Sequence, residues 1–142
     1  MPDITHFLRV QASPEDVYVA LTTTEGIRHW WTRDASVEAE LGGTGEFAFH
    51  HRDAVTKVQV DELQPALSVG WTTLSSNAPG GWDGTTIHFE LREDGAGTGV
   101  SFAHRGFEEE NDGYRRVTDG WEHDLASLRA YLETGNGTPH DE

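Results

Sequence analysis

The sequence predicts an α+β domain in which a curved antiparallel sheet of about seven strands wraps around a long C-terminal helix. Two observations carry this prediction. Segments in which apolar residues alternate with polar ones fill most of residues 36 to 105, and short turns rich in Gly and Pro separate them. From residue 114 to residue 132, apolar residues then recur at the spacing of a helix. Such a helix must bury its apolar stripe, and the apolar face of the sheet is the partner available.

The N-terminal part of the chain predicts one strand followed by two short helices. Residues 4–10 are rich in β-branched and aromatic side chains, which is typical of a strand. Ser13 can cap a helix that has Pro14 in its first position and Asp16 three residues after the cap. A second short helix begins at Thr24 and carries Ile27, Trp30 and Trp31. Because almost nothing separates the two helices, they form an elbow.

The middle of the chain predicts six strands, at residues 36–41, 45–51, 55–63, 66–74, 84–92 and 98–105. Successive strands on short turns are antiparallel neighbours. Side chains two apart share a face, so we expect Phe47, Phe49 and His51 to point the same way, and likewise Phe102 and His104. One side of the sheet is therefore apolar and aromatic.

The last helix is predicted to begin at Asn111 or Asp112 and to end at Gly135. Its apolar positions lie three or four residues apart, at Tyr114, Val117, Trp121, Leu125, Leu128 and Leu132. We expect a single domain over residues 1–135, followed by a flexible acidic tail at 136–142.

Charge and composition exclude several classes of protein. The 142 residues include 10 Lys and Arg against 25 Asp and Glu, a net charge of −15, which argues against nucleic-acid and anionic-membrane partners. The absence of cysteine excludes disulfides, thiol nucleophiles, cysteine-ligated zinc and iron–sulfur clusters. No basic leader and no apolar run of about 18 residues is present, so we expect a cytoplasmic protein.

The candidate binding site is the space between the sheet and the last helix. Large rings there can line a pocket or fill the interior, and both outcomes stay open at this stage. The candidate ligand-binding residues are Trp30 or its neighbour Trp31, Phe47, Phe49, His51, Val58, Trp71, Phe89, Phe102, His104, Trp121 and Leu125. His104 and His51 are either pocket donors or core histidines bonded to a neighbouring hydroxyl, with His104 the better pocket candidate.

Metal and nucleophilic sites are not predicted. Eight histidines are present, but His50 and His51 point to opposite faces of a strand, and His6, His29, His123 and His140 are scattered. No two histidines follow the spacing by which a helix holds a metal ion, and no Gly-x-Ser-x-Gly motif occurs. We therefore expect no metal, no cofactor and no assigned catalytic residue.

A set of short motifs resembles a known superfamily. These are Ser13-Pro14-Glu15, Leu21-Thr22-Thr23, Glu25-Gly26-Ile27 with Trp30-Trp31, Gly42-Gly43, Trp82-x-Gly84-Thr85, Phe102-x-His104-x-Gly106-Phe107, Gly120-Trp121 and Tyr131-Leu132-Glu133-Thr134-Gly135. Together, over residues 4–135, they resemble the SRPBCC (START-like) superfamily, in the AHSA-like subgroup related to the activator of the heat-shock chaperone ATPase. The resemblance implies a helix-grip fold with an elongated cavity for a lipid, polyketide or other apolar molecule.

Three functions are compatible with this resemblance. The first is non-catalytic binding of a hydrophobic small molecule. The second is an enzyme of the polyketide cyclase or aromatase type, with His104 or His51 as the acid or base. The third is a protein-interaction module, a chaperone partner or a dimer, that uses a sheet edge or the Trp30-Trp31 elbow. We favour the first, expect a monomer or weak homodimer, and give chaperone interaction little weight.

Overall fold

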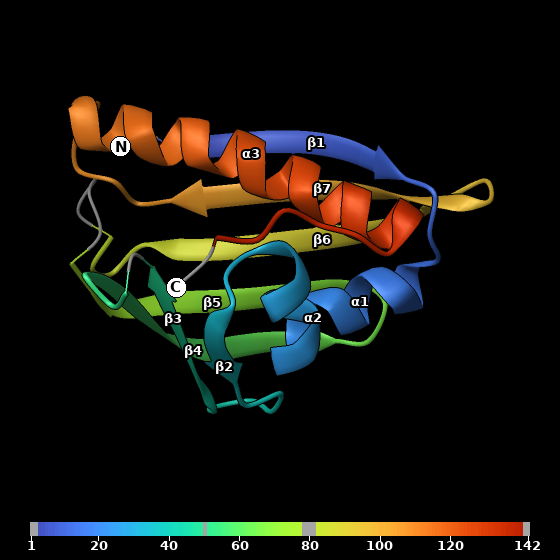
Figure 1. Ribbon diagram of the computed structural model, residues 1–142, viewed down its shortest axis with the longest axis horizontal. Coiled ribbons are helices and arrows are strands. Elements are labelled where there is room, and N and C mark those ends of the chain that lie inside the picture. The colour runs from blue at the N-terminus through green and yellow to red at the C-terminus, as the bar shows by residue number, and fades with distance from the viewer. Residues whose placement is uncertain (1–2, 50, 78–81, 141–142) are drawn as a thin grey trace.

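The computed structural model describes residues 3–49, 51–77 and 82–140. Its seven-stranded sheet contains β1 (Ile4–Val10), β2 (Asp34–Val37), β3 (Thr44–Phe49), β4 (Ala54–Gln64), β5 (Ser68–Ser76), β6 (Thr86–Asp94) and β7 (Gly97–Arg105). The strand order is β1-β7-β6-β5-β4-β3-β2, and every neighbouring pair is antiparallel (Figure 1). The predicted antiparallel sheet is confirmed, with β1 pairing to the last strand.

The two short helices, α1 (Pro14–Thr22) and α2 (Thr24–Trp30), form the predicted elbow. The Ser13 hydroxyl accepts the backbone N–H of Asp16 and so caps α1. Thr23 ends α1 and also begins α2, because its hydroxyl accepts the backbone N–H of Gly26. Gly26 sits so close to α1 that a Cβ atom there would lie 2.7 Å from the Cα of Ala20. The tight elbow therefore depends on a glycine.

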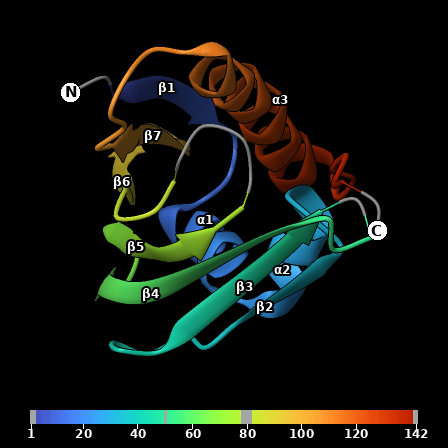
Figure 2. The same ribbon diagram turned by 90° about the vertical axis from the view of Figure 1, so that its left-hand side faces the viewer.

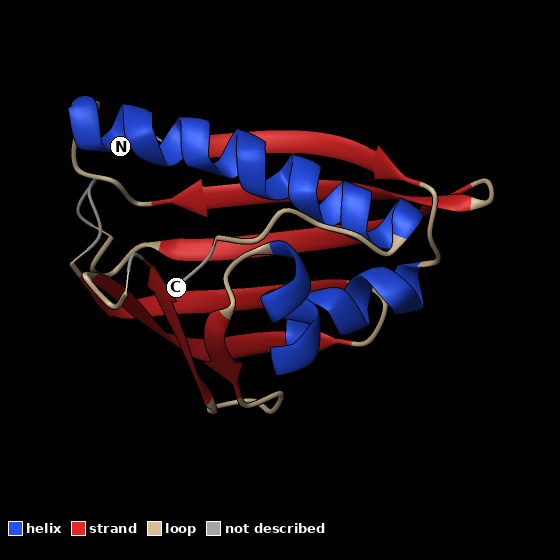
Figure 3. Cartoon of the chain, viewed as in Figure 1, coloured by secondary structure: helices blue, strands red, loops and turns tan. Residues whose placement is uncertain are grey.

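The long helix α3 (Asp112–Thr134) has the predicted ends. The side chain of Asn111 accepts the N–H of Tyr114, and Gly135 ends the helix with φ +86°, a left-handed conformation that favours glycine. All three helices lie on the same side of the curved sheet (Figures 1, 2 and 3), so the core lies between them and that face. No helix in the described ranges is long and apolar enough to cross a membrane.

The expectation that His51 shares the face of Phe47 and Phe49 was wrong. Strand β3 ends at Phe49, and the chain then turns with positive φ at His51 (+56°) and Arg52 (+70°). His51 is exposed to solvent as a result. In the sequence, the alternation of apolar and polar residues continues past Phe49. In the structure, the strand ends there, so the side chain of His51 no longer follows the alternation of faces along β3. The neighbouring His50 lies outside the described residues, as do residues 78–81.

The segment after α3 does not form the frayed tail that we expected from residue 136. The backbone of His140 accepts from the N–H of Arg33 (3.1 Å) and donates to the carbonyl of Trp31 (2.8 Å). The N–H of Thr138 donates to the hydroxyl of Ser127 at 2.7 Å. Gly137 passes so close to α2 that a Cβ atom would lie 2.4 Å from the carbonyl oxygen of His29. Residues 137–140, called the C-terminal segment below, are thus packed between α2 and α3.

Candidate functional site

Five aromatic rings form a closed loop in the centre of the core. Around the loop, the centroid distances are 6.1 Å from Trp31 to Trp71, 5.7 Å to Phe89, 5.2 Å to Phe102, 4.5 Å to Trp121 and 5.1 Å back to Trp31. These are the separations of rings in contact. The elongated space expected between the sheet and α3 is filled by side chains at this level.

Most of the predicted site residues are core residues. Nine of the eleven are at most 4% exposed: Trp30, Phe47, Val58, Trp71, Phe89, Phe102, His104, Trp121 and Leu125. Phe49 is half-buried, and His51 is exposed. Trp30 and Trp31 are 0% and 1% exposed, and the indole of Trp30 donates to the carbonyl of Ala20 at 2.8 Å. The elbow tryptophans therefore offer no contact surface to a protein partner.

His104 is held on both ring nitrogens by other residues of the core. The indole N–H of Trp121, which can only donate, gives its proton to Nδ1 at 3.0 Å. Nε2 therefore carries the ring proton and donates to the hydroxyl of Thr85 at 2.9 Å. That hydroxyl donates in turn to the carbonyl of Trp82 at 2.6 Å. The geometry is that of a core histidine with a fixed tautomer. The sequence left open whether His104 is such a core histidine or a pocket donor.

Burial explains the charge state of His104. The side chain is 0% exposed, and the loss of water lowers the pKa of its imidazole from 6.5 to about 3. At neutral pH the ring is uncharged, with both nitrogens occupied. In this conformation His104 has no free lone pair or N–H for a ligand.

A pocket of about 280 Å³ lies beside the aromatic loop. It is bounded by the N-terminal half of α3, the end of β3, the start of β4, Trp82 and the C-terminal segment. The lining residues are Trp31, Phe49, Ala54, Trp82, Arg116, Val117, Gly120, Trp121, Asp124 and His140. Phe49 and Trp121 are the two predicted site residues among them. Trp31, which we left as an alternative to Trp30, is the elbow tryptophan that reaches the pocket.

Three ionisable side chains meet this otherwise apolar pocket: Arg116, Asp124 and His140. The Nε2 of His140 lies 2.9 Å from a carboxylate oxygen of Asp124. Burial raises the pKa of the Asp124 carboxyl, although hydrogen bonds from His140 and the Trp31 side chain partly oppose this. The hydrogen bond to Asp124 raises the pKa of the His140 imidazole. The two groups thus form a partly buried pair at the edge of the pocket, with Asp124 buried and the His140 side chain 34% exposed.

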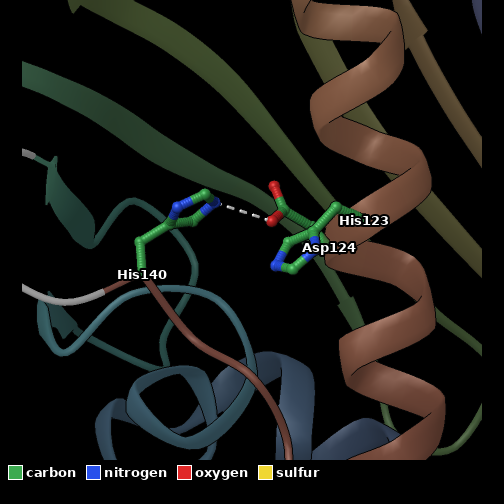
Figure 4. Close-up of side chains that lie close together, drawn as sticks. All are labelled: His123, Asp124 and His140. Atoms are coloured by element: carbon green, nitrogen blue, oxygen red, sulfur yellow. Dashed lines mark hydrogen bonds and ion pairs between the residues drawn. The ribbon is translucent and has the colours of Figure 1, made fainter.

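His123 joins this pair, so the expectation that His123 and His140 are scattered was wrong. One ligand atom each from His123, Asp124 and His140 lies within 4.8 Å of the others. Figure 4 shows His123 and Asp124 on α3 and His140 reaching Asp124 from the C-terminal segment. No local pattern in the sequence could reveal this group, because it depends on where the end of the chain docks.

Comparison with known proteins places the chain in a family. The family model described as "Activator of Hsp90 ATPase homolog 1-like protein" matches residues 11–133. The chain belongs to this family. A search of curated proteins found no match.

Solved structures agree with this assignment. The solution structure of the Aha1 dimer from Colwellia psychrerythraea is 36% identical, with a TM-score of 0.85 over 96% of this chain and 100% of that one. A protein of Staphylococcus saprophyticus is 23% identical, with a TM-score of 0.76 over 96% of each chain. DynU16 of the dynemicin biosynthetic locus is 17% identical, with a TM-score of 0.74 over 95% of this chain and 48% of that one. The last two show the fold alone.

The family and the fold confirm the resemblance drawn from the sequence and the helix-grip α+β architecture.

Proposed function

We propose that this protein is a cytoplasmic, non-catalytic binding protein for a small, mostly apolar molecule of one or two rings. The pocket beside α3 is the proposed site. The volume of this pocket is the observation that carries the proposal. At about 280 Å³ it lies just below the range of roughly 300 to 1,000 Å³ that is usual for pockets of drug-sized ligands, so it suits a smaller molecule.

The lining supports an aromatic ligand. Six of the ten lining residues are apolar: Trp31, Phe49, Ala54, Trp82, Val117 and Trp121. Burial of apolar ligand surface against these side chains contributes about 25 cal/mol per Å². The filled aromatic loop argues against the long lipid tail that the sequence left open, since the space continues along the helix only as far as these rings.

One polar group on the ligand would complete the fit. Arg116 is an exposed residue that lines the pocket, and none of the ion pairs found within the described ranges involves it. A guanidinium in this position suits a carboxylate or phenolate on the ligand. The ligand class that we propose is therefore a small aromatic acid or phenol.

Gly120 offers a direct test because it lines the pocket on α3 and a Cβ atom there would meet nothing within 4 Å. A leucine at this position would project into the hollow. We expect Gly120→Leu to abolish binding of a probe such as 1-naphthoate, measured by calorimetry or tryptophan fluorescence, while the fold stays intact.

Two control variants give this test its meaning. Gly120→Ala adds a single methyl group and removes a glycine from a helix, so it should raise stability by about 0.5 to 1 kcal/mol. Arg115→Leu places the same large side chain on an exposed position of α3, away from the pocket lining, and should leave binding unchanged. If no member of a panel of aromatic acids and phenols binds, or if Gly120→Leu binds as well as Arg115→Leu, the proposed site is wrong.

A homodimer is a second proposal, supported by one observation. The 36% identical relative from Colwellia psychrerythraea is a dimer in solution. Light scattering coupled to size exclusion should give a mass near twice 15.7 kDa at high protein concentration. A mass that stays at the monomer value up to the highest soluble concentration would contradict this.

A further inference from the structure

We propose that His123, Asp124 and His140 form a binding site for a divalent transition-metal ion of the zinc type. The three residues come from two parts of the chain. His123 and Asp124 lie on α3, whereas His140 lies in the C-terminal segment, so an ion here would tie that segment to the helix (Figure 4).

The donor set fits this class of metal. Two imidazoles and one carboxylate, without sulfur, are ligands that zinc, cobalt, nickel and iron accept, whereas calcium and magnesium prefer oxygen alone. Zinc sites with three protein ligands keep a fourth position for water or a bound molecule. Asp124 and His140 also line the pocket, so that fourth position would lie near its edge.

The spacing of the three groups is close to what an ion needs. Zinc–nitrogen and zinc–oxygen bonds of about 2.0 to 2.2 Å place neighbouring ligand atoms about 3.4 Å apart in a tetrahedron. The three ligand atoms lie within 4.8 Å of one another, so the widest pair would close by at most about 1.4 Å. His140 and Asp124, at 2.9 Å, would separate slightly as the ion replaces the proton between them.

The surroundings hold the three side chains near this arrangement. Asp124 is only 6% exposed, so its carboxylate has little freedom to turn away from His140. The Nε2 of His123 lies 3.2 Å from the carbonyl oxygen of Thr138, so the segment that carries His140 also contacts the His123 ring. When Nε2 donates its proton to this carbonyl, Nδ1 is the ring nitrogen that keeps a free lone pair for an ion. The net charge of −15 favours the approach of a cation to any part of this protein.

The test uses the full chain, freed of metal by chelation, with Zn²⁺ and Co²⁺ as probes and no other ligand. We expect Co²⁺ to give visible absorption bands that saturate at one equivalent, and Zn²⁺ to displace it. His123→Ala should weaken binding of both ions by at least about tenfold, as loss of a metal-site residue does. His123 is exposed, so this variant should keep the Asp124–His140 pair and the fold.

Two further variants separate a metal site from ordinary histidine binding. His29→Ala removes an exposed histidine of α2 that lies outside the group, and it should leave Co²⁺ affinity unchanged. Asp124→Asn can still accept a hydrogen bond from His140 but is a weak metal ligand, so it should reduce affinity as His123→Ala does. The proposal is overturned if the protein binds no stoichiometric Co²⁺, or if His123→Ala and His29→Ala affect binding equally; in that case the pair is only a clasp for the C-terminal segment. None of these measurements uses an aromatic ligand, so the result is independent of the proposed function.

Discussion

Trp121 lies between two regions of this molecule that differ in how completely the protein encloses their polar side chains. On one side of its indole lies His104, which is fully enclosed and bonded on both nitrogens. On the other side lies the pocket, where His140 and Asp124 meet at the edge of a hollow. Both regions contain a histidine against aromatic rings. Only the second leaves space next to it.

The difference shows that burial alone does not mark a functional histidine. Complete satisfaction by the protein makes His104 a part of the core, and burial holds it neutral. His140 is held by a carboxylate next to open volume, and its hydrogen-bond partner raises its pKa. The histidine with space beside it is therefore the better candidate for contact with something outside the protein.

The largest effect should come from removing Trp121, which contacts His104 and also lines the pocket. Trp121→Ala takes one ring out of the closed loop and leaves Nδ1 of His104 without its donor. We expect a loss of about 3 to 5 kcal/mol in the free energy of unfolding, measured by urea titration. Phe49→Ala, beside the pocket and only half-buried, should cost clearly less. If the two variants lose the same free energy of unfolding, the aromatic loop and the pocket wall are equally well packed, and the comparison between the two regions fails.

The next effect concerns the pH dependence that His104 imposes. Its folded pKa of about 3 lies below the ordinary 6.5, so between these values the unfolded chain binds a proton that the folded chain does not. The contribution of His104 to the free energy of unfolding is therefore complete above about pH 6.5. It declines by about 1.4 kcal/mol for each pH unit as the pH falls below that value.

We expect His104→Gln, which is neutral and able to donate and accept, to flatten this decline. The measurement is the free energy of unfolding at pH 8 and at pH 5 for both proteins. The unchanged protein should lose about 2 kcal/mol more than the variant over this interval. Parallel pH profiles would show that the imidazole is hydrated or charged in the folded state, contrary to its enclosed position.

The smallest effect tests how the C-terminal segment closes the pocket. The hydroxyl of Ser127 donates to the carbonyl of Trp30 and accepts the N–H of Thr138, both at 2.7 Å. Ser127→Ala should lower stability by about 1 kcal/mol and speed amide exchange at Thr138 and His140. Ser101→Ala, on the exposed face of β7, is the matched control and should change neither. Unaltered exchange in Ser127→Ala would indicate that other contacts hold the segment.

Local patterns in the sequence determined the elements and their faces. The helical spacing in α3 and its terminal Asn111 and Gly135 were predicted correctly, because capping and periodicity act within a few residues. The alternation of the strands correctly placed Phe102 and His104 on the inner face. It failed at His51, where a turn with positive φ ended the strand while the alternating pattern continued.

The tertiary structure alone decided how much space the rings leave and which side chains border it. Whether five rings fill a core or line a cavity depends on their mutual packing, and composition does not contain that information. His140 reaches Asp124 because the segment after α3 docks against Trp31 and Ser127, contacts between residues far apart in the chain. Short-range periodicity cannot specify such contacts, so the candidate site emerged only from the fold.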